Sequence, residues 1–144
     1  MPLVYFDASA LVKLLTEEPG SDLAAELWDG CDAAVASRLA YPEVCAALAA
    51  AGRNHDLTEH ELIAAGQTWR EYWAAIRPVE LTTAVGQHAG RLTRSHALRG
   101  ADAVHLASAL AVGDPGLVMA VWDRRLHRGA WSAGLRVAPS ALDP

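Results

Sequence analysis

Short apolar runs separated by longer helix-compatible segments set the pattern of this chain. The runs lie at residues 3–6, 33–35, 78–81, 117–121 and 135–137. Each is too short for a helix and predicts a strand. Strands that alternate with helices are joined by crossover connections and pair in parallel. We therefore predict an α/β fold: a single α/β/α domain over residues 1–144, with a short, mostly parallel central sheet flanked by helices.

Residues that cap or end helices divide the segments between these strands. The predicted helices lie at residues 9–15, 21–28, 37–52, 58–76, 82–96, 102–112 and from 123 onward. Thr58 and Glu61 have the spacing of a capping box. Ser37 is a candidate N-cap for the third helix. Pro42 then requires that this helix either kinks or starts late, because proline has no backbone N–H to donate.

Four acidic residues stand where predicted elements begin: Asp7, Glu43, Asp102 and Asp123. Asp7 and Asp123 follow strands, and the carboxyl edge of an open α/β sheet is where ligands bind. Four carboxylates meeting there would repel one another unless protonated or bridged by cations. Mg²⁺ takes oxygen ligands and often binds a few carboxylates together with substrate phosphates. The acids therefore suggest a metal-dependent enzyme that acts on phosphodiesters.

Each acid, taken singly, also has a structural explanation. Asp7 or Ser9 can cap the first helix, and Asp123 can cap the last. Asp102 can complement a helix N-terminus, while Glu43 can be an exposed helix residue. The structural explanation is the better one for any single acid. That four acids would all stand at such positions by coincidence is harder to accept, so the set as a whole favours a shared site.

The composition fits a globular domain, and we expect the chain to be cytoplasmic. Hydrophobic residues make up 52% and charged residues 20% of the 144 residues. No apolar run reaches the length that crosses a bilayer, and the chain starts on a strand-like run without a charged leader. Cys31 and Cys45 lack the spacing of metal ligands. We expect them to be small buried hydrophobic residues in a reducing compartment.

The charge is unevenly distributed, which weakens an objection to nucleic-acid binding. A net charge of −5 lacks the basic footprint of such proteins. Residues 1–72, however, hold 12 acids and 4 bases, whereas residues 73–144 hold 5 acids and 8 bases. A local basic rim can therefore coexist with an acidic whole. A solvated charged face remains an equal alternative for any one arginine.

Four sequence motifs surround the acids. They are Val4-Tyr5-Phe6-Asp7-Ala8-Ser9-Ala10-Leu11, Ser37-x4-Pro42-Glu43-Val44-x2-Ala47-Leu48, Leu98-Arg99-Gly100-Ala101-Asp102-Ala103-Val104-His105-Leu106-Ala107 and Val121-Trp122-Asp123-Arg124-Arg125-Leu126. Together they resemble the four motifs of the PIN-domain nucleases over nearly the whole chain. The pattern is most similar to the single-domain VapC toxins of bacterial toxin–antitoxin pairs.

The resemblance implies a PIN-like fold and a ribonuclease site. In that family, the acids that match Asp7, Glu43, Asp102 and Asp123 bind Mg²⁺ or Mn²⁺. The hydroxyl that matches Ser9 supports this site. The chain departs from the family at Val121, where a threonine or serine often stands two residues before the fourth acid.

The resemblance also implies partners. An RNA substrate is expected, and Arg99, Arg124 and Arg125 are candidates for holding its phosphates. A cognate antitoxin would fold onto the domain and block the site, in a homodimer or a toxin–antitoxin hetero-oligomer. The apolar positions Leu11, Leu14 and Leu15 can receive the antitoxin's hydrophobic residues, or can belong to the core.

Two residues beside the acids have competing interpretations. His105, three residues after Asp102, can be a proton shuttle or a partner to the acids. A packing histidine with local hydrogen bonds is the simpler reading. Trp122 can stack on a base, but packing is more common for such a residue.

Two other functions compete with the nuclease. A phosphatase with Asp7 as nucleophile fits poorly, because Ser9 stands where such enzymes place a second acid. A catalytically weak PIN-like domain that binds RNA or protein is the other alternative, and retention of all four acids argues against it.

Overall fold

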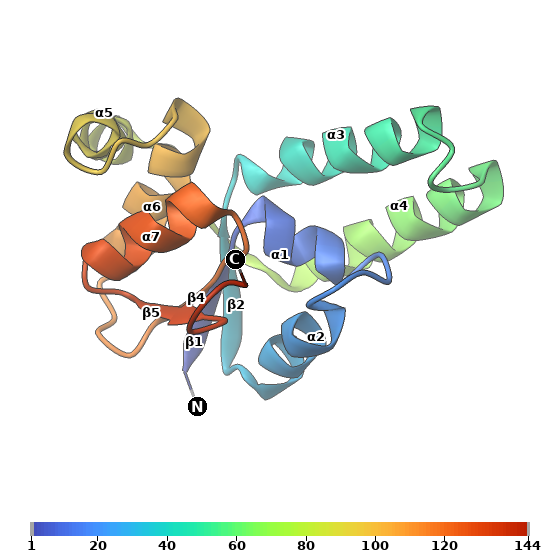
Figure 1. Ribbon diagram of the computed structural model, residues 1–144, viewed down its shortest axis with the longest axis horizontal. Coiled ribbons are helices and arrows are strands. Elements are labelled where there is room, and N and C mark those ends of the chain that lie inside the picture. The colour runs from blue at the N-terminus through green and yellow to red at the C-terminus, as the bar shows by residue number, and fades with distance from the viewer. Residues whose placement is uncertain (1, 144) are drawn as a thin grey trace.

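A five-stranded sheet runs through the middle of the computed structural model, which describes residues 2–143 (Figure 1). The strands are β1 (Leu3–Phe6), β2 (Ala33–Ser37), β3 (Arg77–Val79), β4 (Val118–Ala120) and β5 (Arg136–Ala138). Their order is β3-β2-β1-β4-β5, and every pairing is parallel. The predicted α/β fold with a parallel sheet is confirmed.

Helices cover both faces of the sheet. They are α1 (Ala8–Lys13), α2 (Ser21–Gly30), α3 (Ala40–Arg53), α4 (Glu59–Ala75), α5 (Thr83–Ser95), α6 (Gly100–Val112) and α7 (Arg124–Ser132). In Figure 1, α1 to α4 lie on one side of the sheet, and α5, α6 and α7 lie on the other. None of the helices within residues 2–143 has the length and apolar character needed to cross a membrane.

The central strand β1 supplies side chains to both faces of the core. Tyr5 belongs to the cluster formed with α5, α6 and α7, whereas Val4 and Phe6 belong to the cluster beneath α1, α3 and α4. All three side chains are at most 1% exposed. A parallel sheet covered on both faces reads as a continuous apolar run, which is why the sequence of β1 does not alternate.

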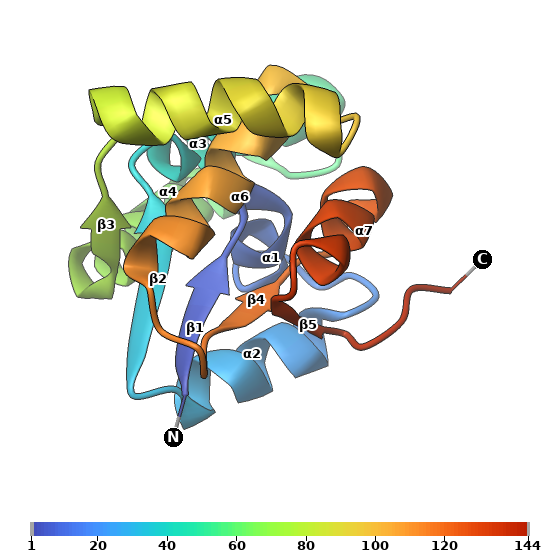
Figure 2. The same ribbon diagram turned by 90° about the vertical axis from the view of Figure 1, so that its left-hand side faces the viewer.

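The chain reverses direction across the sheet between β1 and β4. From β1 it proceeds through β2 to β3 at one edge, then returns to the other side of β1 to form β4 and β5. Connections that leave neighbouring strands in opposite directions open a crevice at the carboxyl ends of those strands, where α/β proteins bind ligands. Figure 2 shows β1 and β4 side by side, with α1 and α7 following them. Asp7 follows β1 directly, and its N–H donates to the Ala120 carbonyl of β4 at 3.3 Å.

Several helix starts differ from the predicted ones. Ser37 does not cap α3: it is the last residue of β2, and its hydroxyl accepts from the Leu39 N–H at 3.1 Å. The helix begins at Ala40, so Pro42 occupies the third helical position, where no intrahelical partner exists for an N–H. The late start resolves the conflict without a kink. α6 begins at Gly100, two residues before Asp102.

Other local predictions hold. Thr58 and Glu61 form the capping box at the start of α4. Asp7, not Ser9, caps α1, and Asp123 caps α7.

The expectation that both cysteines are buried is wrong for Cys45. This residue is exposed and lines a hollow between α3 and α4, while Cys31 is half-buried. Small residues on the outward side of an alanine-rich helix carry no signal that separates them from the buried side.

Candidate active site

Asp7 is an acid buried at the crevice between β1 and β4. Its carboxylate is the N-cap of α1, and its Oδ1 accepts from the Ala10 N–H at 2.9 Å and from the Ser9 hydroxyl at 2.7 Å. Only 4% of the residue is exposed. Burial raises the pKa of Asp7 to about 6; His105 and the two hydrogen bonds oppose this rise, and the charge of Asp123 adds to it. A charged Asp7 is therefore costly unless a cation lies beside it.

Asp102 and Asp123 lie near each other and share one arginine. Asp123 caps α7 through the Leu126 N–H at 3.0 Å, and Asp102 lies in the first turn of α6. The Arg99 guanidinium lies 3.4 Å from Asp102 Oδ2 through Nε and 3.7 Å from Asp123 Oδ2 through Nη2. Burial, and after it the charge of Asp123, raises the pKa of Asp102, while Arg99 and His105 oppose the rise. Asp102 and Asp123 are therefore close to each other and to Arg99, and the charge of Asp123 also acts on Asp7.

Glu43 reaches the same region from the first turn of α3. Its Oε1 lies 2.5 Å from His105 Nε2, and His105 Nδ1 lies 2.7 Å from the Tyr5 hydroxyl. His105 is 3% exposed, as a packing histidine would be. Its partners, however, lie 62 and 100 residues away, so the expectation of local hydrogen bonds is wrong. Tyr5 was not singled out from the sequence, although it is the one polar side chain within the apolar strand that leads to Asp7.

Ser9 connects the ends of the two strands. Its hydroxyl donates to Asp7 and accepts from the Trp122 N–H at 3.4 Å. Val121, the position at which the family often has a hydroxyl residue, is fully buried in the cluster of α6 and α7. A side chain directed into that core is apolar for packing reasons, and Ser9 provides the hydroxyl between Asp7 and the strand that precedes Asp123.

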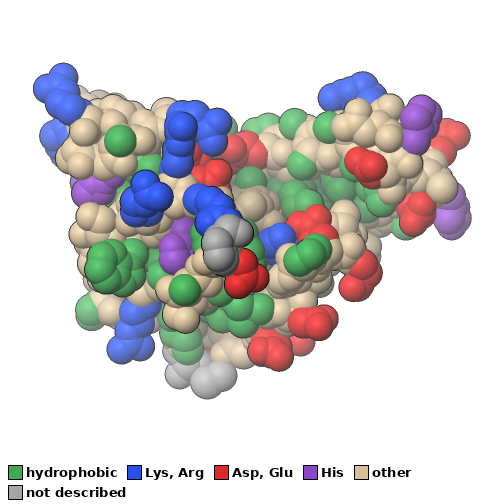
Figure 3. All heavy atoms as spheres, in the orientation of Figure 1, with side chains coloured by type: hydrophobic (Ala, Val, Ile, Leu, Met, Phe, Trp, Pro, Cys, Tyr) green, Lys and Arg blue, Asp and Glu red, His purple; other side chains and the backbone are tan. Residues whose placement is uncertain are grey.

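The remaining candidates lie around this centre. Arg124 donates to the carbonyl of Asp143, and Arg125 is exposed at the start of α7. Trp122 packs: it is half-buried, and the Lys13 ammonium lies 5.2 Å from the centre of its ring. Figure 3 shows Lys and Arg side chains mostly over α5, α6 and α7, whereas most acidic side chains lie on the other half of the molecule. The acidic site therefore borders the basic half.

The donor chemistry of the site fits a hard divalent cation. Carboxylate oxygens are the ligands that Mg²⁺ and Mn²⁺ prefer, and the raised pKa values of Asp7 and Asp102 reflect burial and acidic crowding that a cation would relieve. Among residues 2–143, no group of three or more Asp, Glu, His or Cys side chains is arranged so that it could hold a metal ion. Arg99, placed between Asp102 and Asp123, contributes positive charge at that point.

The chain is similar to known proteins over nearly its whole length. Residues 4–131 match the family model described as PIN domain. The chain belongs to the PIN-domain family. It is 77% identical over 144 residues to Ribonuclease VapC49 of Mycobacterium tuberculosis, and all of both chains is covered.

Solved structures of more distant proteins share the fold. The structure of VapC20 from Mycobacterium tuberculosis, a toxin that cleaves the sarcin–ricin loop, matches with a TM-score of 0.66 and 17% identity over 92% of this chain and 95% of that one. A toxin–antitoxin complex from Klebsiella pneumoniae contains a chain that matches with a TM-score of 0.62 and 18% identity, over 83% of this chain and 86% of that one. The PIN-domain fold predicted from the four motifs is confirmed.

The buried Asp7 predicts how stability depends on pH in the metal-free protein. An acid whose pKa is raised on folding, here from 3.8 to about 6, binds more protons in the folded state, so its contribution to stability falls as pH rises across that window. The full loss above the window is about 3 kcal/mol. Asp7→Asn keeps an oxygen for the Ser9 and Ala10 hydrogen bonds and should remove this fall.

Urea unfolding in EDTA across this pH range measures the effect, with Asp22→Asn as a matched control on the exposed first turn of α2. The control should follow the wild type. Parallel pH profiles for the wild type and Asp7→Asn would contradict the assignment.

Proposed function

We propose that this protein is a divalent-metal-dependent endoribonuclease, and that it is the toxin of a VapBC-type toxin–antitoxin pair. The observation that carries the proposal is the burial of Asp7 at the strand crevice, where the charge of Asp123 raises its pKa further, together with the pairing of Asp102 and Asp123 on Arg99. Full-length similarity to a protein named a ribonuclease of the VapC group supports the same substrate class.

In this proposal the four acids hold the ion and position the reacting phosphodiester. Asp7, Asp102 and Asp123 supply oxygen ligands, and Glu43 adds a fourth carboxylate from α3. A bound divalent cation polarises the scissile phosphate and lowers the pKa of an attacking water. Ser9 orients Asp7 through the 2.7 Å hydrogen bond. No side chain needs to act as a nucleophile.

The RNA backbone is proposed to lie along the basic rim of the site. Arg99 and Arg125 are exposed beside the acids, and Arg124 follows Asp123 directly. Guanidinium groups bind phosphate oxygens in a bidentate manner and carry no sequence information themselves. When a metal ion binds Asp102 and Asp123, it neutralises their charge. Arg99 is then free to bind a substrate phosphate.

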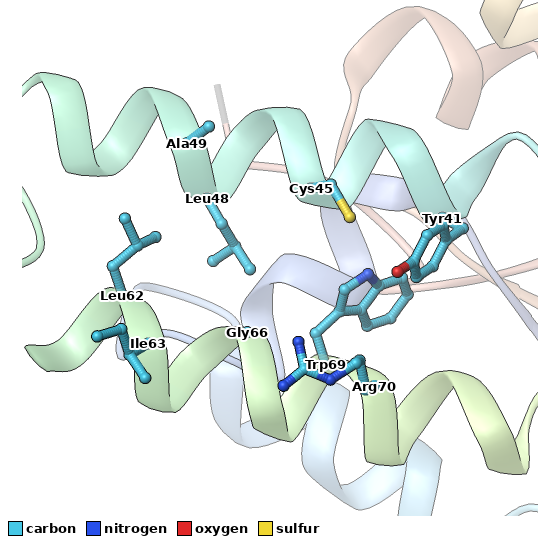
Figure 4. Close-up of a pocket in the computed structure, with 9 residues that line it drawn as sticks. All are labelled: Tyr41, Cys45, Leu48, Ala49, Leu62, Ile63, Gly66, Trp69 and Arg70. Carbon is cyan, nitrogen blue, oxygen red and sulfur yellow. The ribbon is translucent and has the colours of Figure 1, made fainter. Parts of the chain in front are cut away.

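An antitoxin is proposed as the protein partner, with its apolar residues seated on the α3–α4 side. Leu14 and Leu15 line a groove of about 920 Å³ together with residues of α3 and α4, whereas Leu11 is fully buried and is not available. A second hollow of about 400 Å³ lies between α3 and α4, where Ile63 remains 57% exposed (Figure 4). Apolar surface next to an acidic pocket suits a tail that carries both hydrophobic residues and an arginine.

Cleavage of total RNA by the purified protein tests the enzymatic proposal. Activity should require Mg²⁺ or Mn²⁺ and disappear in EDTA. Asp7→Asn and Asp102→Asn remove a formal charge and should each reduce cleavage at least about 100-fold, as loss of a preorganised electrostatic group does. Asp22→Asn should be unaffected.

Two outcomes would reject the enzymatic proposal. Full activity of Asp7→Asn in EDTA would reject metal-dependent cleavage. RNA binding without cleavage in any of these ions would favour the binding-domain alternative.

Ser9→Ala should lose about tenfold to a hundredfold in activity, the range for a group that supports a metal ligand. The mutation removes the hydroxyl that joins Asp7 to the Trp122 N–H but leaves every carboxylate in place. Ser132→Ala, at the exposed end of α7, is the matched control. If Ser9→Ala is as inactive as Asp7→Asn, Ser9 is itself a metal ligand.

Co-expression with the small gene expected beside this one tests the partner. Its product should bind the protein, relieve toxicity and be displaced as the Mg²⁺ concentration rises, because its arginine and the ion compete for the same carboxylates. Alanine at that arginine should weaken inhibition. A product that neither binds nor protects would show that the chain is a PIN-domain nuclease of another kind.

A further inference from the structure

A line of hydrogen bonds runs through the core from β2 to Glu43. The Ser37 N–H donates to the Tyr5 hydroxyl at 3.1 Å, the hydroxyl lies 2.7 Å from His105 Nδ1, and His105 Nε2 lies 2.5 Å from Glu43 Oε1. Tyr5 is fully buried and His105 is 3% exposed, so water does not compete for these groups. The line ends at one of the four acids of the site.

The chemistry of its two ends fixes the donor in the first and the last of these hydrogen bonds. A backbone N–H can only donate, so the phenol oxygen of Tyr5 accepts from Ser37. Burial raises the pKa of Tyr5 well above its ordinary value, so the phenol keeps its proton. His105 Nδ1 lies 2.7 Å from this oxygen, and Ser108 is a second side-chain neighbour of the phenol. At the other end a carboxylate can only accept, so His105 Nε2–H donates to Glu43.

Glu43 is held less firmly by its own helix than Asp7 and Asp123 are, and the hydrogen bond from His105 compensates for this. Asp7 and Asp123 cap helices and are fixed by backbone N–H groups within their own turn. Glu43 has a longer side chain, lies in the first turn of α3 without a capping role, and is 29% exposed. His105 is the side chain that fixes its carboxylate. Because Tyr5 lies on β1 two residues before Asp7, the same strand positions both acids.

We infer that Tyr5 and His105 are positioning residues, which form a Tyr5–His105–Glu43 hydrogen-bond chain that holds the Glu43 carboxylate toward the metal ion. The inference rests on the proposed function, because it assigns the chain a role in metal binding. His105 acts through Glu43 and does not contact the substrate. Groups that orient metal-binding carboxylates typically change metal affinity about tenfold to a hundredfold when they are removed.

Two amide substitutions of His105 separate the two ends of the chain. The side-chain nitrogen of His105→Gln reaches the position of Nε2 and can donate to Glu43. The amide of His105→Asn reaches only the position of Nδ1, so it keeps the contact with Tyr5 and loses Glu43. Titration of Mn²⁺ into the metal-free protein, followed by electron paramagnetic resonance, measures affinity without any need for turnover.

The expected pattern is that His105→Asn and His105→Ala bind Mn²⁺ about tenfold to a hundredfold more weakly, while His105→Gln loses less than about tenfold. Tyr5→Phe should also weaken binding, because His105 Nδ1 loses its hydrogen-bond partner and the ring is held less firmly. Equal affinities for His105→Asn and His105→Gln, or an unchanged affinity for His105→Ala, would overturn the inference.

Leu106→Ala controls for stability. Leu106 is next to His105 on α6 and fully buried in the core, away from the acids. It should lower the melting temperature without changing Mn²⁺ affinity. If Leu106→Ala weakens Mn²⁺ binding as much as His105→Asn does, general loosening explains the effect and the positioning role is rejected.

The tautomer of His105 in the wild-type protein gives a test without substitution. Long-range ¹H–¹⁵N spectra of the metal-free protein should show a proton on Nε2, the nitrogen that faces Glu43. An Nε2 without a proton would overturn the inference.

The wild type and Asp7→Asn separate this inference from the proposed function. If they bind Mn²⁺ equally weakly, the metal-dependent function itself fails. If only Asp7→Asn is impaired while His105→Ala binds normally, the function stands and this inference alone is wrong.

Discussion

Placing a carboxylate where water barely reaches it is the constraint on which the rest of this structure depends. Asp7 is 4% exposed at the end of the central strand, and a buried charge is costly unless hydrogen bonds and cations compensate for it. The Ala10 N–H and the Ser9 hydroxyl provide part of this compensation. The charge of Asp123 adds to the cost of charging Asp7. In the proposed function, a divalent cation offsets the part of this cost that the two hydrogen bonds leave uncompensated.

The position of β1 explains how one strand can organise so much of the site. It pairs with β2 on one side and β4 on the other, and its side chains enter both core clusters. A strand that is paired along both edges and packed on both faces has little freedom to move. The residue that follows it, Asp7, is therefore held in a fixed position. Glu43 is connected to the same strand through His105 and Tyr5, although it is carried by α3.

Much of this arrangement can be predicted from the sequence, because its signals are local. The strand before Asp7, the capping box of Thr58 and the cap formed by Asp123 are all encoded within a few residues. The contacts that were missed depend on distant partners. Ser37 pairs with Val79 and belongs to β2, although its local sequence pattern favours a helix cap. Tyr5 meets His105 across 100 residues, and Arg99 meets Asp123 across a crevice that only the sheet order creates. The spacing of apolar residues along the sequence does not indicate contacts between such distant residues.

The reversal of the chain between β1 and β4 also sets when the site can exist. Its first acid is residue 7 and its last is residue 123, and the strand that carries the last one pairs directly with the strand that carries the first. Chains are synthesised at about 5–20 residues per second, so roughly ten seconds separate the appearance of Asp7 from that of Asp123. During that time the growing chain has a partial set of carboxylates and no β4 to close the crevice. A protein that cuts RNA would therefore complete its cutting site only when its own synthesis is nearly finished.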